Sequence, residues 1–361
     1  MERAADALAR GFPLAEPAWF AVLRALCAVG EGADVRIPVS SIPPAMRTSG
    51  AACVAAVLGD ACRRLSILGG RDGMPRSLGS VYGSLVTRFV GGLRGKVSRV
   101  IKTPGIKSWS NCVAVSRDGC TLLVSDDWGG SNSIHTYCAL SGAFQRTIGC
   151  WGHGALQFWK PHQVWVASDD HVFVADQGNN RIQVLTPRVF EFHGFVGVGQ
   201  LEGPSGVCAD EHVVCVSELV NRVSVFGRGD GTLLRRLGGL RYGYSMLKNP
   251  HGLCFMSKNQ HVAVADRANH RITVFSLEGE FIRTVGYYEF NNPTGVACSE
   301  RGGELIVACA GYDGGVFVFS ANDELLHTME RGFFRGVAMH GDAIFAQTTK
   351  DDGGCMCMVF T

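Results

Sequence analysis

The sequence lacks any apolar run long enough to cross a membrane and any strong excess of one charge. Its 361 residues contain 34 Lys and Arg against 32 Asp and Glu, a formal net charge of +2, so no overall field attracts DNA or an anionic membrane. The best apolar stretch, residues 18–30, contains Arg24 and is shorter than the roughly 18 residues that a spanning helix needs. Glu16 and Pro17 precede it, where a secretory signal would carry basic residues. We therefore expect a cytoplasmic protein without membrane contact.

Metal-ligand spacing and catalytic motifs are also missing. The 14 cysteines are scattered, and the closest pair, Cys355 and Cys357, encloses a single residue, which is not the CxxC spacing of a zinc site. At this density the cysteines are expected to be free, mostly buried thiols in a reducing compartment. The motifs GxSxG, GxxxxGK(S/T) and HExxH are absent. The sequence therefore predicts no cofactor, no metal ion and no motif-based enzymatic activity.

One phrase occurs twice: residues 172–182 read VFVADQGNNRI and residues 262–272 read VAVADRANHRI. A related copy, VCVSELVNRV, lies at residues 214–223. Leading prolines precede these copies and a weaker fourth one. They fall 43, 46 and 43 residues apart, at Pro161, Pro204, Pro250 and Pro293. Self-similarity at a nearly constant spacing of this length indicates a repeat architecture.

Each unit holds short runs of Val, Ile, Phe and Cys broken by Gly, Asp and Asn, which is typical of strands joined by hairpins. Four such strands are too few to bury both faces of a sheet, so neighbouring units must stack, as in a β-propeller. Units beginning near residues 110 and 334 bring the count to six, and the last has only three strands. Residues 97–102 resemble the fourth strands, so we expect them to close the ring by pairing with residues 356–360. The predicted fold is an all-β, six-bladed propeller with four-stranded antiparallel blades over residues 96–361.

The repeated phrase predicts a hairpin lock within a blade. Asp176 and Asp266 end the second strand, and Arg181 and Arg271 open the third strand five residues later. This spacing lets the guanidinium reach back across the turn to the carboxylate.

The pattern VxVADxxNxRIxVF after PxGVAV resembles the NHL repeat family of β-propellers over residues 110–361. The resemblance implies a domain that presents a face to a partner, and some members of the family bind RNA on a basic face. Ser217, with Glu218 beside it, stands at the acid position of the third unit, and Cys309 and Gly315 replace the acid and the arginine of the fifth unit. We therefore expect looser locks in these two blades.

Residues 1–95 differ from the repeats and are expected to form an N-terminal extension. Residues 17–30 and 49–68 predict two short helices, and residues 69–95 are rich in Gly, Ser and Arg, as in a linker. Members of the NHL family often carry RING, B-box or coiled-coil modules before the propeller. No such pattern occurs in this stretch, which argues against a ubiquitin ligase.

A ring of six polar residues is expected around the central channel. Each follows the leading residue of an inner strand, and they are Asn111, His162, Ser205, His251, Thr294 and Arg335. Peptidyl-amidoglycolate lyase, which has a similar fold, holds zinc with inner-strand histidines at such a place. Only two histidines occur here, and the third alternate position is Arg335, whose guanidinium cannot act as a ligand. We therefore expect a polar channel or a small-anion site near Arg335 rather than a metal site.

Two surfaces are candidates for partner binding. Trp128, Trp151 and Trp159 lie in irregular loops, where exposed rings favour protein contact. The alternative is that these rings cover a junction between blades. The basic segment 222–248 contains residues suited to single-stranded RNA, namely Arg228, Arg235, Arg236, Arg241 and Tyr242. Arg228 is expected on an exposed turn, and the alternative for the whole segment is a solvated outer strand.

The sequence thus predicts a non-catalytic interaction scaffold whose propeller face binds a protein partner, in a protein expected to be monomeric. Two alternatives stay open. One is an RNA-binding propeller that uses residues 222–248. The other is a metal-dependent, lyase-like enzyme with its site in the central channel.

Overall fold

The computed structural model describes residues 97–360 apart from short gaps at 104–105, 107–109, 128–130, 239–244, 257–260, 287–288, 290, 300–302, 311–313 and 350–354. For residues 110, 111 and 349 the backbone alone is described. The helices expected at 17–30 and 49–68 and the linker at 69–95 lie outside the described residues. So do three candidate site residues, Trp128, Arg241 and Tyr242.

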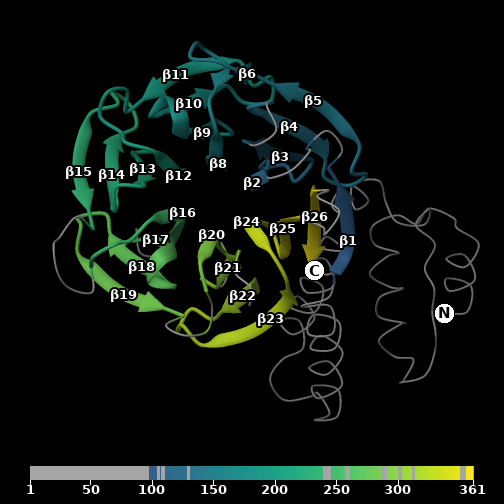
Figure 1. The fold of residues 1–361 in the computed structure, drawn as a ribbon, viewed down its shortest axis with the longest axis vertical. Coiled ribbons are helices and arrows are strands. Elements are labelled where there is room, and N and C mark those ends of the chain that lie inside the picture. The colour runs from purple at the N-terminus through teal and green to yellow at the C-terminus, as the bar shows by residue number, and fades with distance from the viewer. Residues whose placement is uncertain are drawn as a thin grey trace, which may run out of the picture. The chain divides into compact units, whose positions relative to one another are not determined.

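Six sheets of four strands form the blades of a propeller (Figure 1). Within each sheet every neighbouring pair of strands is antiparallel, as the first and last hairpins of the ring illustrate. The predicted six-bladed all-β propeller with four-stranded antiparallel blades is therefore confirmed.

The strands follow one another in chain order from blade to blade. Blade 1 comprises β2 (Ser110–Val115), β3 (Thr121–Asp126), β4 (Ser133–Cys138) and β5 (Phe144–Ile148). Blade 2 comprises β8 (Pro161–Val166), β9 (Val172–Asp176), β10 (Arg181–Leu185) and β11 (Phe192–Val196). Blade 3 comprises β12 (Pro204–Ala209), β13 (Val213–Glu218), β14 (Arg222–Gly227) and β15 (Leu233–Leu237). Blade 4 comprises β16 (Pro250–Met256), β17 (His261–Asp266), β18 (Arg271–Ser276) and β19 (Phe281–Val285). Blade 5 comprises β20 (Pro293–Cys298), β21 (Leu305–Cys309), β22 (Gly315–Phe319) and β23 (Leu325–Arg331). Blade 6 comprises β24 (Phe334–His340), β25 (Ala343–Thr349), β26 (Cys355–Phe360) and β1 (Val97–Lys102).

Smaller elements lie between these strands. The short strands β6 (Cys150–Trp151) and β7 (Gln157–Phe158) pair in parallel within the connector from blade 1 to blade 2. Single turns of 3-10 helix, η2 (Gln177–Asn179) and η3 (Arg267–Asn269), follow β9 and β17. No helix in the described part of the chain has the length and apolar character needed to cross a membrane.

The inner strands β2, β8, β12, β16, β20 and β24 contact one another in a closed cycle around the centre of the ring (Figure 1). Blade 6 joins strands from both ends of the propeller, because β1 pairs with β26 from Val97 opposite Phe360 to Lys102 opposite Met356. Without β1 the last strand in the chain would be an unpaired edge. Ile101 of β1 is 2% exposed, so this strand also adds to the core.

The core lies between neighbouring blades rather than within single sheets. The middle strands β9 and β10 are buried along their whole length, whereas the outer strand β5 is exposed at every residue except Ile148. One core cluster joins Ala175 and Ile182 of blade 2 to Val216 and Phe226 of blade 3. Burying a large aliphatic or aromatic side chain stabilises a fold by on the order of 1.5–3 kcal/mol. A single blade would leave these side chains in water, which explains why the unit is repeated.

Among the described cysteines all are free thiols and most are buried, as predicted.

Glycines let the inner strands approach closely on one side of the ring. A Cβ atom at Gly206 or Gly252 would lie 2.4 or 2.7 Å from a carbonyl oxygen of the next inner strand. Blade 2 carries Gln163 at the equivalent position instead. Its Nε2 donates to the carbonyl of Leu253 at 3.0 Å, and its Oε1 accepts from the N–H groups of Val207 and Leu253, each at 3.1 Å. Gln163 therefore ties three inner strands together beside the channel.

Candidate functional site

The candidate functional residues lie mainly at the end of the blades where the inner strands begin, called here the top face. Pro161 pairs with Asp176, and Pro250 pairs with Asp266. The start of an inner strand therefore lies beside the end of the second strand of the same blade. As a result, the connectors between blades and the turns after the second strands share the top face.

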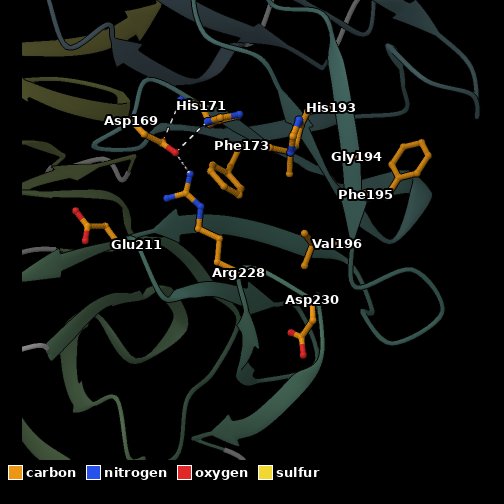
Figure 2. Close-up of a pocket in the computed structure, with 13 residues that line it drawn as sticks. Asp169, His171, Phe173, His193, Gly194, Phe195, Val196, Glu211, Arg228 and Asp230 are labelled. Carbon is orange, nitrogen blue, oxygen red and sulfur yellow. Dashed lines mark hydrogen bonds and ion pairs between the residues drawn. The ribbon is translucent and has the colours of Figure 1, made fainter.

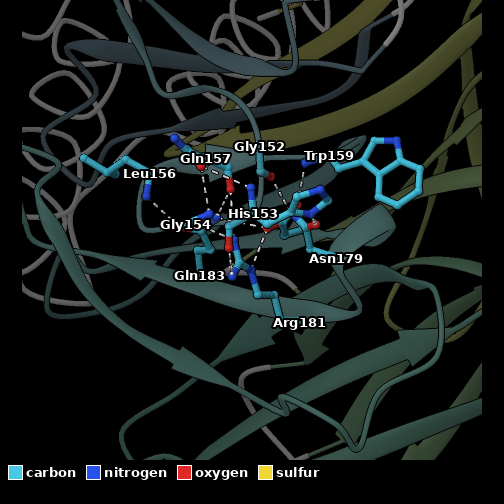
Figure 3. A network of polar contacts seen from close by, with 10 residues as sticks. Gly152, His153, Gly154, Leu156, Gln157, Trp159, Asn179, Arg181 and Gln183 are labelled. Carbon is cyan, nitrogen blue, oxygen red and sulfur yellow. Dashed lines mark hydrogen bonds and ion pairs between the residues drawn. The ribbon is translucent and has the colours of Figure 1, made fainter.

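Blade 2 contains the complete hairpin lock that the repeat predicts (Figure 3). Asp176 is fully buried and accepts a hydrogen bond from Arg181 Nε at 2.9 Å and another from Gln183 Nε2 at 2.9 Å. Its second oxygen accepts from the backbone N–H of Trp159 at 2.8 Å, and Asn179 Nδ2 donates to both oxygens. The carboxylate is thus paired and hydrogen-bonded on all sides, the condition under which a buried charge is tolerated.

Blade 4 repeats this arrangement. Asp266 accepts from Arg271 Nε at 2.9 Å and from Asn269 Nδ2 at 2.9 Å. The helical turns η2 and η3 end at Asn180 and His270, which have left-handed φ angles of 52° and 54°. Asn in particular adopts this backbone conformation at low cost, which accounts for these polar residues before each arginine.

The expectation of a looser lock in blade 3 was based on Ser217, and the structure shows a different residue in the acid position. Glu218 is fully buried, and both Nε and Nη2 of Arg222 donate to it at 2.8 Å. Ser217 instead points away from the lock and donates to the carbonyl of His251. The turn of blade 3 is one residue shorter, so Glu218 lies opposite Pro204 and Arg222 as Asp176 lies opposite Pro161 and Arg181, and the ion pair is kept. In blade 5, Cys309 lies opposite Pro293, where blades 1 to 4 carry the acid.

The lock of blade 2 also holds the connector that precedes it (Figure 3). Arg181 donates through Nη1 to the carbonyl of His153 at 2.7 Å, and through Nη2 to those of Gly154 at 2.7 Å and Gln157 at 3.0 Å. Gln183 donates to the carbonyl of Gln157 at 2.5 Å. These bonds fix the irregular backbone of residues 150–159 on the top face.

Two tryptophans of this connector are exposed. Trp151 and Trp159 expose 59% and 42% of their surface, and the ring of His153 lies edge-on to both, with centroids 5.7 and 5.9 Å away. We call these three side chains the aromatic platform. A Cβ atom at Gly178 would lie 2.5 Å from the Trp159 ring, so the absence of a side chain there lets the ring lie flat on η2. Phe158 is fully buried and packs in the cluster between blades 1 and 2, so it covers the blade junction while the tryptophans face solvent.

Two of the predicted ring residues meet across the channel. The rings of His162 and His251 come from alternate blades, and their centroids lie 5.0 Å apart. Ser205 and Thr294 turn their hydroxyl groups to the backbone of the next inner strand, with bonds of 2.7 Å and 3.1 Å to carbonyl oxygens. They therefore stabilise the ring of inner strands. Asn111 is described by its backbone alone.

Both channel histidines are neutral at pH 7. Burial lowers the pKa of His162 to about 4, the hydrogen bond to the carbonyl of Ser205 opposes this shift, and the charges of Arg335 and Arg267 add to it. The pKa of His251 lies well below its ordinary value because of burial, the neighbouring His162 and the charges of the same two arginines. Neutral imidazoles can bind metals, but within the described residues no group of three or more His, Cys, Asp or Glu side chains is arranged so that it could hold a metal ion.

Arg267 is a channel residue that the sequence analysis missed. It lies on η3, directly after the lock acid of blade 4, and its Nη1 is 3.2 Å from His251 Nε2. Burial lowers the pKa of Arg335, while the charge of Asp127 raises it and that of Arg267 lowers it. Asp127 directly follows Asp126, which lies opposite Ser110 at the acid position of blade 1. The position after the lock acid was therefore the signal that could have identified both residues.

The structure distributes the described members of the basic segment over different surroundings. Arg235 and Arg236 lie on the exposed outer strand β15, where Arg235 donates to the carbonyl of Leu277 in blade 4 and Arg236 to that of Gln200 before blade 3. Arg228 contacts neither of them. The described cations of this segment therefore do not line one groove.

Arg228 lies in a cleft of about 590 Å³ at the other end of blades 2 and 3 (Figure 2). Its Nη2 is 2.5 Å from Asp169 Oδ2, and its guanidinium lies 5.2 Å from the centre of the Phe173 ring. Burial is the largest single effect on the pKa of Asp169 and raises it, but the hydrogen bonds from Arg228 and from the backbone N–H of His171, together with the charges of these two residues, lower the pKa to about 2. His171 Nδ1 lies 3.0 Å from the same carboxylate. The expectation that Arg228 is on an exposed turn is wrong, because this turn packs against the β8–β9 turn of blade 2.

Comparisons with known proteins agree with the repeat pattern. The family model of the NHL repeat matches residues 158–185 and 247–275, which contain the complete locks of blades 2 and 4. The chain is 26% identical over 132 residues to the protein brain tumor of Drosophila melanogaster, a match that covers 36% of this chain and 12% of that protein. The match thus spans a small part of the length of that relative.

Solved structures with the same fold include a streptogramin B lyase, with a TM-score of 0.53 at 12% identity over 73% of this chain and 97% of that one. The virginiamycin B lyase of Staphylococcus aureus has a TM-score of 0.52 at 12% identity over 73% of this chain and 98% of that one. The structure of U3-55K has a TM-score of 0.53 at 13% identity over 69% of this chain and 77% of that one. At these identities the likeness shows the fold alone. The chain is therefore a six-bladed β-propeller that contains NHL repeats at residues 158–185 and 247–275.

Proposed function

We propose that this protein is a non-catalytic interaction scaffold whose top face binds a protein partner. The observation that carries the proposal is the aromatic platform. Trp151 and Trp159 are exposed side by side with His153, on a connector whose carbonyl groups are bound by Arg181. Large amphipathic rings bury much area on binding and lose little conformational entropy when they are already fixed. Such rings are frequent anchors of protein interfaces.

The comparisons support this role at the level of the fold family. The NHL repeats match within blades 2 and 4, and propellers of this family act in binding to proteins or RNA. The two lyases and U3-55K share only the fold with this chain, at 12–13% identity. Their names therefore favour neither catalysis nor a particular partner here.

The test is quantitative affinity purification with the full chain as bait, followed by crosslinking and identification of both protein and RNA. Trp151→Ala and Trp159→Ala are combined in one variant. The matched control is Leu234→Ala, which removes an exposed apolar side chain from the outer strand β15. Because both tryptophans face solvent, thermal unfolding of the double variant should stay close to that of the wild type.

We expect a protein that crosslinks to the wild-type connector, is lost with the tryptophan variant and is retained with Leu234→Ala. A set of crosslinked proteins that is unchanged by the tryptophan substitutions would contradict the proposal. RNA whose binding is salt-dependent and is lost on combined Arg235→Ala and Arg236→Ala substitution would instead establish the RNA-binding alternative.

A further inference from the structure

The top end of the central channel contains buried hydrogen-bond donors without acceptors. Arg267 Nη1 lies 3.2 Å from His251 Nε2. A guanidinium can only donate, so His251 Nε2 is the acceptor and the neutral ring carries its proton on Nδ1. That Nδ1 and the Nε of Arg267 are both buried and have no hydrogen-bond partner within the described part of the chain. Buried donors of this kind are rare, and they indicate that a water or an ion completes the site.

The charge around these donors favours an anion. Arg267 and Arg335 act on one another and on both histidines, while Asp127 is the acid that acts on Arg335. Since both imidazoles are neutral, two guanidinium groups against one carboxylate leave a formal excess of one positive charge among the described residues of this site. Water would satisfy the donors but would leave this charge unbalanced. A monovalent anion satisfies both requirements.

The depth of the donors favours a carboxylate over a phosphodiester. His162 and His251 are each only 9% exposed, and the inner strands pack closely at Gly206 and Gly252. A carboxylate stands at the end of a side chain or of a small molecule, so it can enter a narrow opening. A phosphodiester continues in both directions along a nucleic-acid strand. Its oxygens therefore cannot reach such donors without forcing the sugars into the same space.

We propose that the channel mouth formed by His251, Arg267 and Arg335 is a binding site for a carboxylate. His251 Nδ1–H and Arg267 Nε–H donate to the carboxylate oxygens, and the guanidinium of Arg335 balances their charge. The carboxylate belongs either to an acidic side chain of a bound protein or to a free organic acid. The first source rests on the proposed protein-binding function of the top face, and the second does not.

The experiment uses the full chain with ¹⁵N-labelled histidine and follows the ring nitrogens by NMR during titration at constant ionic strength. One probe is sodium succinate, and the other is the blocked tripeptide acetyl-Gly-Glu-Gly-amide. We expect a saturable shift of the His251 Nδ1 resonance with at least one of them. Arg267→Gln should weaken binding by about tenfold or more, the effect of losing a charge-assisted hydrogen bond. The matched control Arg236→Gln removes the same charge from the outer strand and should leave the affinity unchanged.

Each outcome bears on the carboxylate site. Tighter binding of the tripeptide identifies a protein side chain as the source, tighter binding of succinate identifies a free acid, and either supports the site. Absence of a saturable shift with both probes overturns it, as does an equal loss in the two arginine variants. Displacement of succinate by an oligouridylate would overturn the choice of carboxylate over phosphodiester.

If Arg267→Gln fails to fold, Arg335→Gln tests the same site. Succinate binding should survive in the variant with Trp151→Ala and Trp159→Ala, so failure of the aromatic platform and failure of this site are distinguishable.

Discussion

Replacing Arg181 by Ala should lower the free energy of unfolding by about 3 kcal/mol. The substitution removes the ion pair with Asp176 and three hydrogen bonds to connector carbonyls. Loss of one partner of a buried pair typically costs about 3–5 kcal/mol because the other charge stays buried. Asp176 keeps the N–H of Trp159 and the side-chain amides of Asn179 and Gln183, so we place the loss at the lower end of this range.

The assay is urea-induced unfolding of the full chain, with Arg235→Ala as the matched control. Arg235 is exposed and its side chain donates a hydrogen bond to the carbonyl of Leu277, so its loss should cost about 0.5 kcal/mol or less. A double-mutant cycle with Asp176→Asn should give a coupling energy of about 1–3 kcal/mol. Equal losses for Arg181→Ala and Arg235→Ala, or no coupling to Asp176, would refute the reasoning that the lock holds the blade.

Two further predictions concern ring closure and pH. A chain that begins at residue 105 lacks β1 and leaves β26 as an open edge. Its unfolding midpoint should therefore be lower, and its transition broader, than for a chain that begins at residue 92. Equal midpoints would argue against closure by β1. His162 has a folded-state pKa of about 4, against roughly 6.5 when unfolded, so between these values the unfolded chain binds more protons and stability falls as the pH is lowered. Urea unfolding from pH 7 to pH 4 should show a loss of about 3 kcal/mol from this residue, and His162→Gln should flatten the profile; an unchanged profile would mean that the ring is not held neutral.

Much of the fold could be predicted because its signals are local and repeated. The leading prolines and the pairs Asp176–Arg181 and Asp266–Arg271 lie within a single hairpin, so their spacing in the sequence reflects their distance in space. The same logic failed at Ser217, because counting five residues back from Arg222 assumed a turn of constant length. The turn of blade 3 is one residue shorter, so Glu218 lies opposite Pro204 and Arg222 in the place of the acid.

The channel could be predicted only in part, because its contacts join strands that are far apart in the sequence. His162 and His251 were expected near the axis from their equivalent positions, whereas the bridge from Gln163 to Leu253 spans ninety residues. Nothing in the repeat marks Gln163, because the position of the glycine also varies in blade 1, where it is Cys112. Arg228 was misplaced for a similar reason: its partner Asp169 is fifty-nine residues away, in the neighbouring blade.

The residues proposed to bind partners stand where the repeat departs from its own pattern. The lock arginines of blades 2 and 4 both donate to the lock acid and to carbonyl groups of the preceding connector. What sets blade 2 apart is the connector itself, because it carries the exposed rings of Trp151 and Trp159. Likewise, η3 differs from η2 by carrying an arginine that faces the channel. Sites that break a local rule inside a regular repeat are expected to serve function, and here both departures lie on the same face of the propeller.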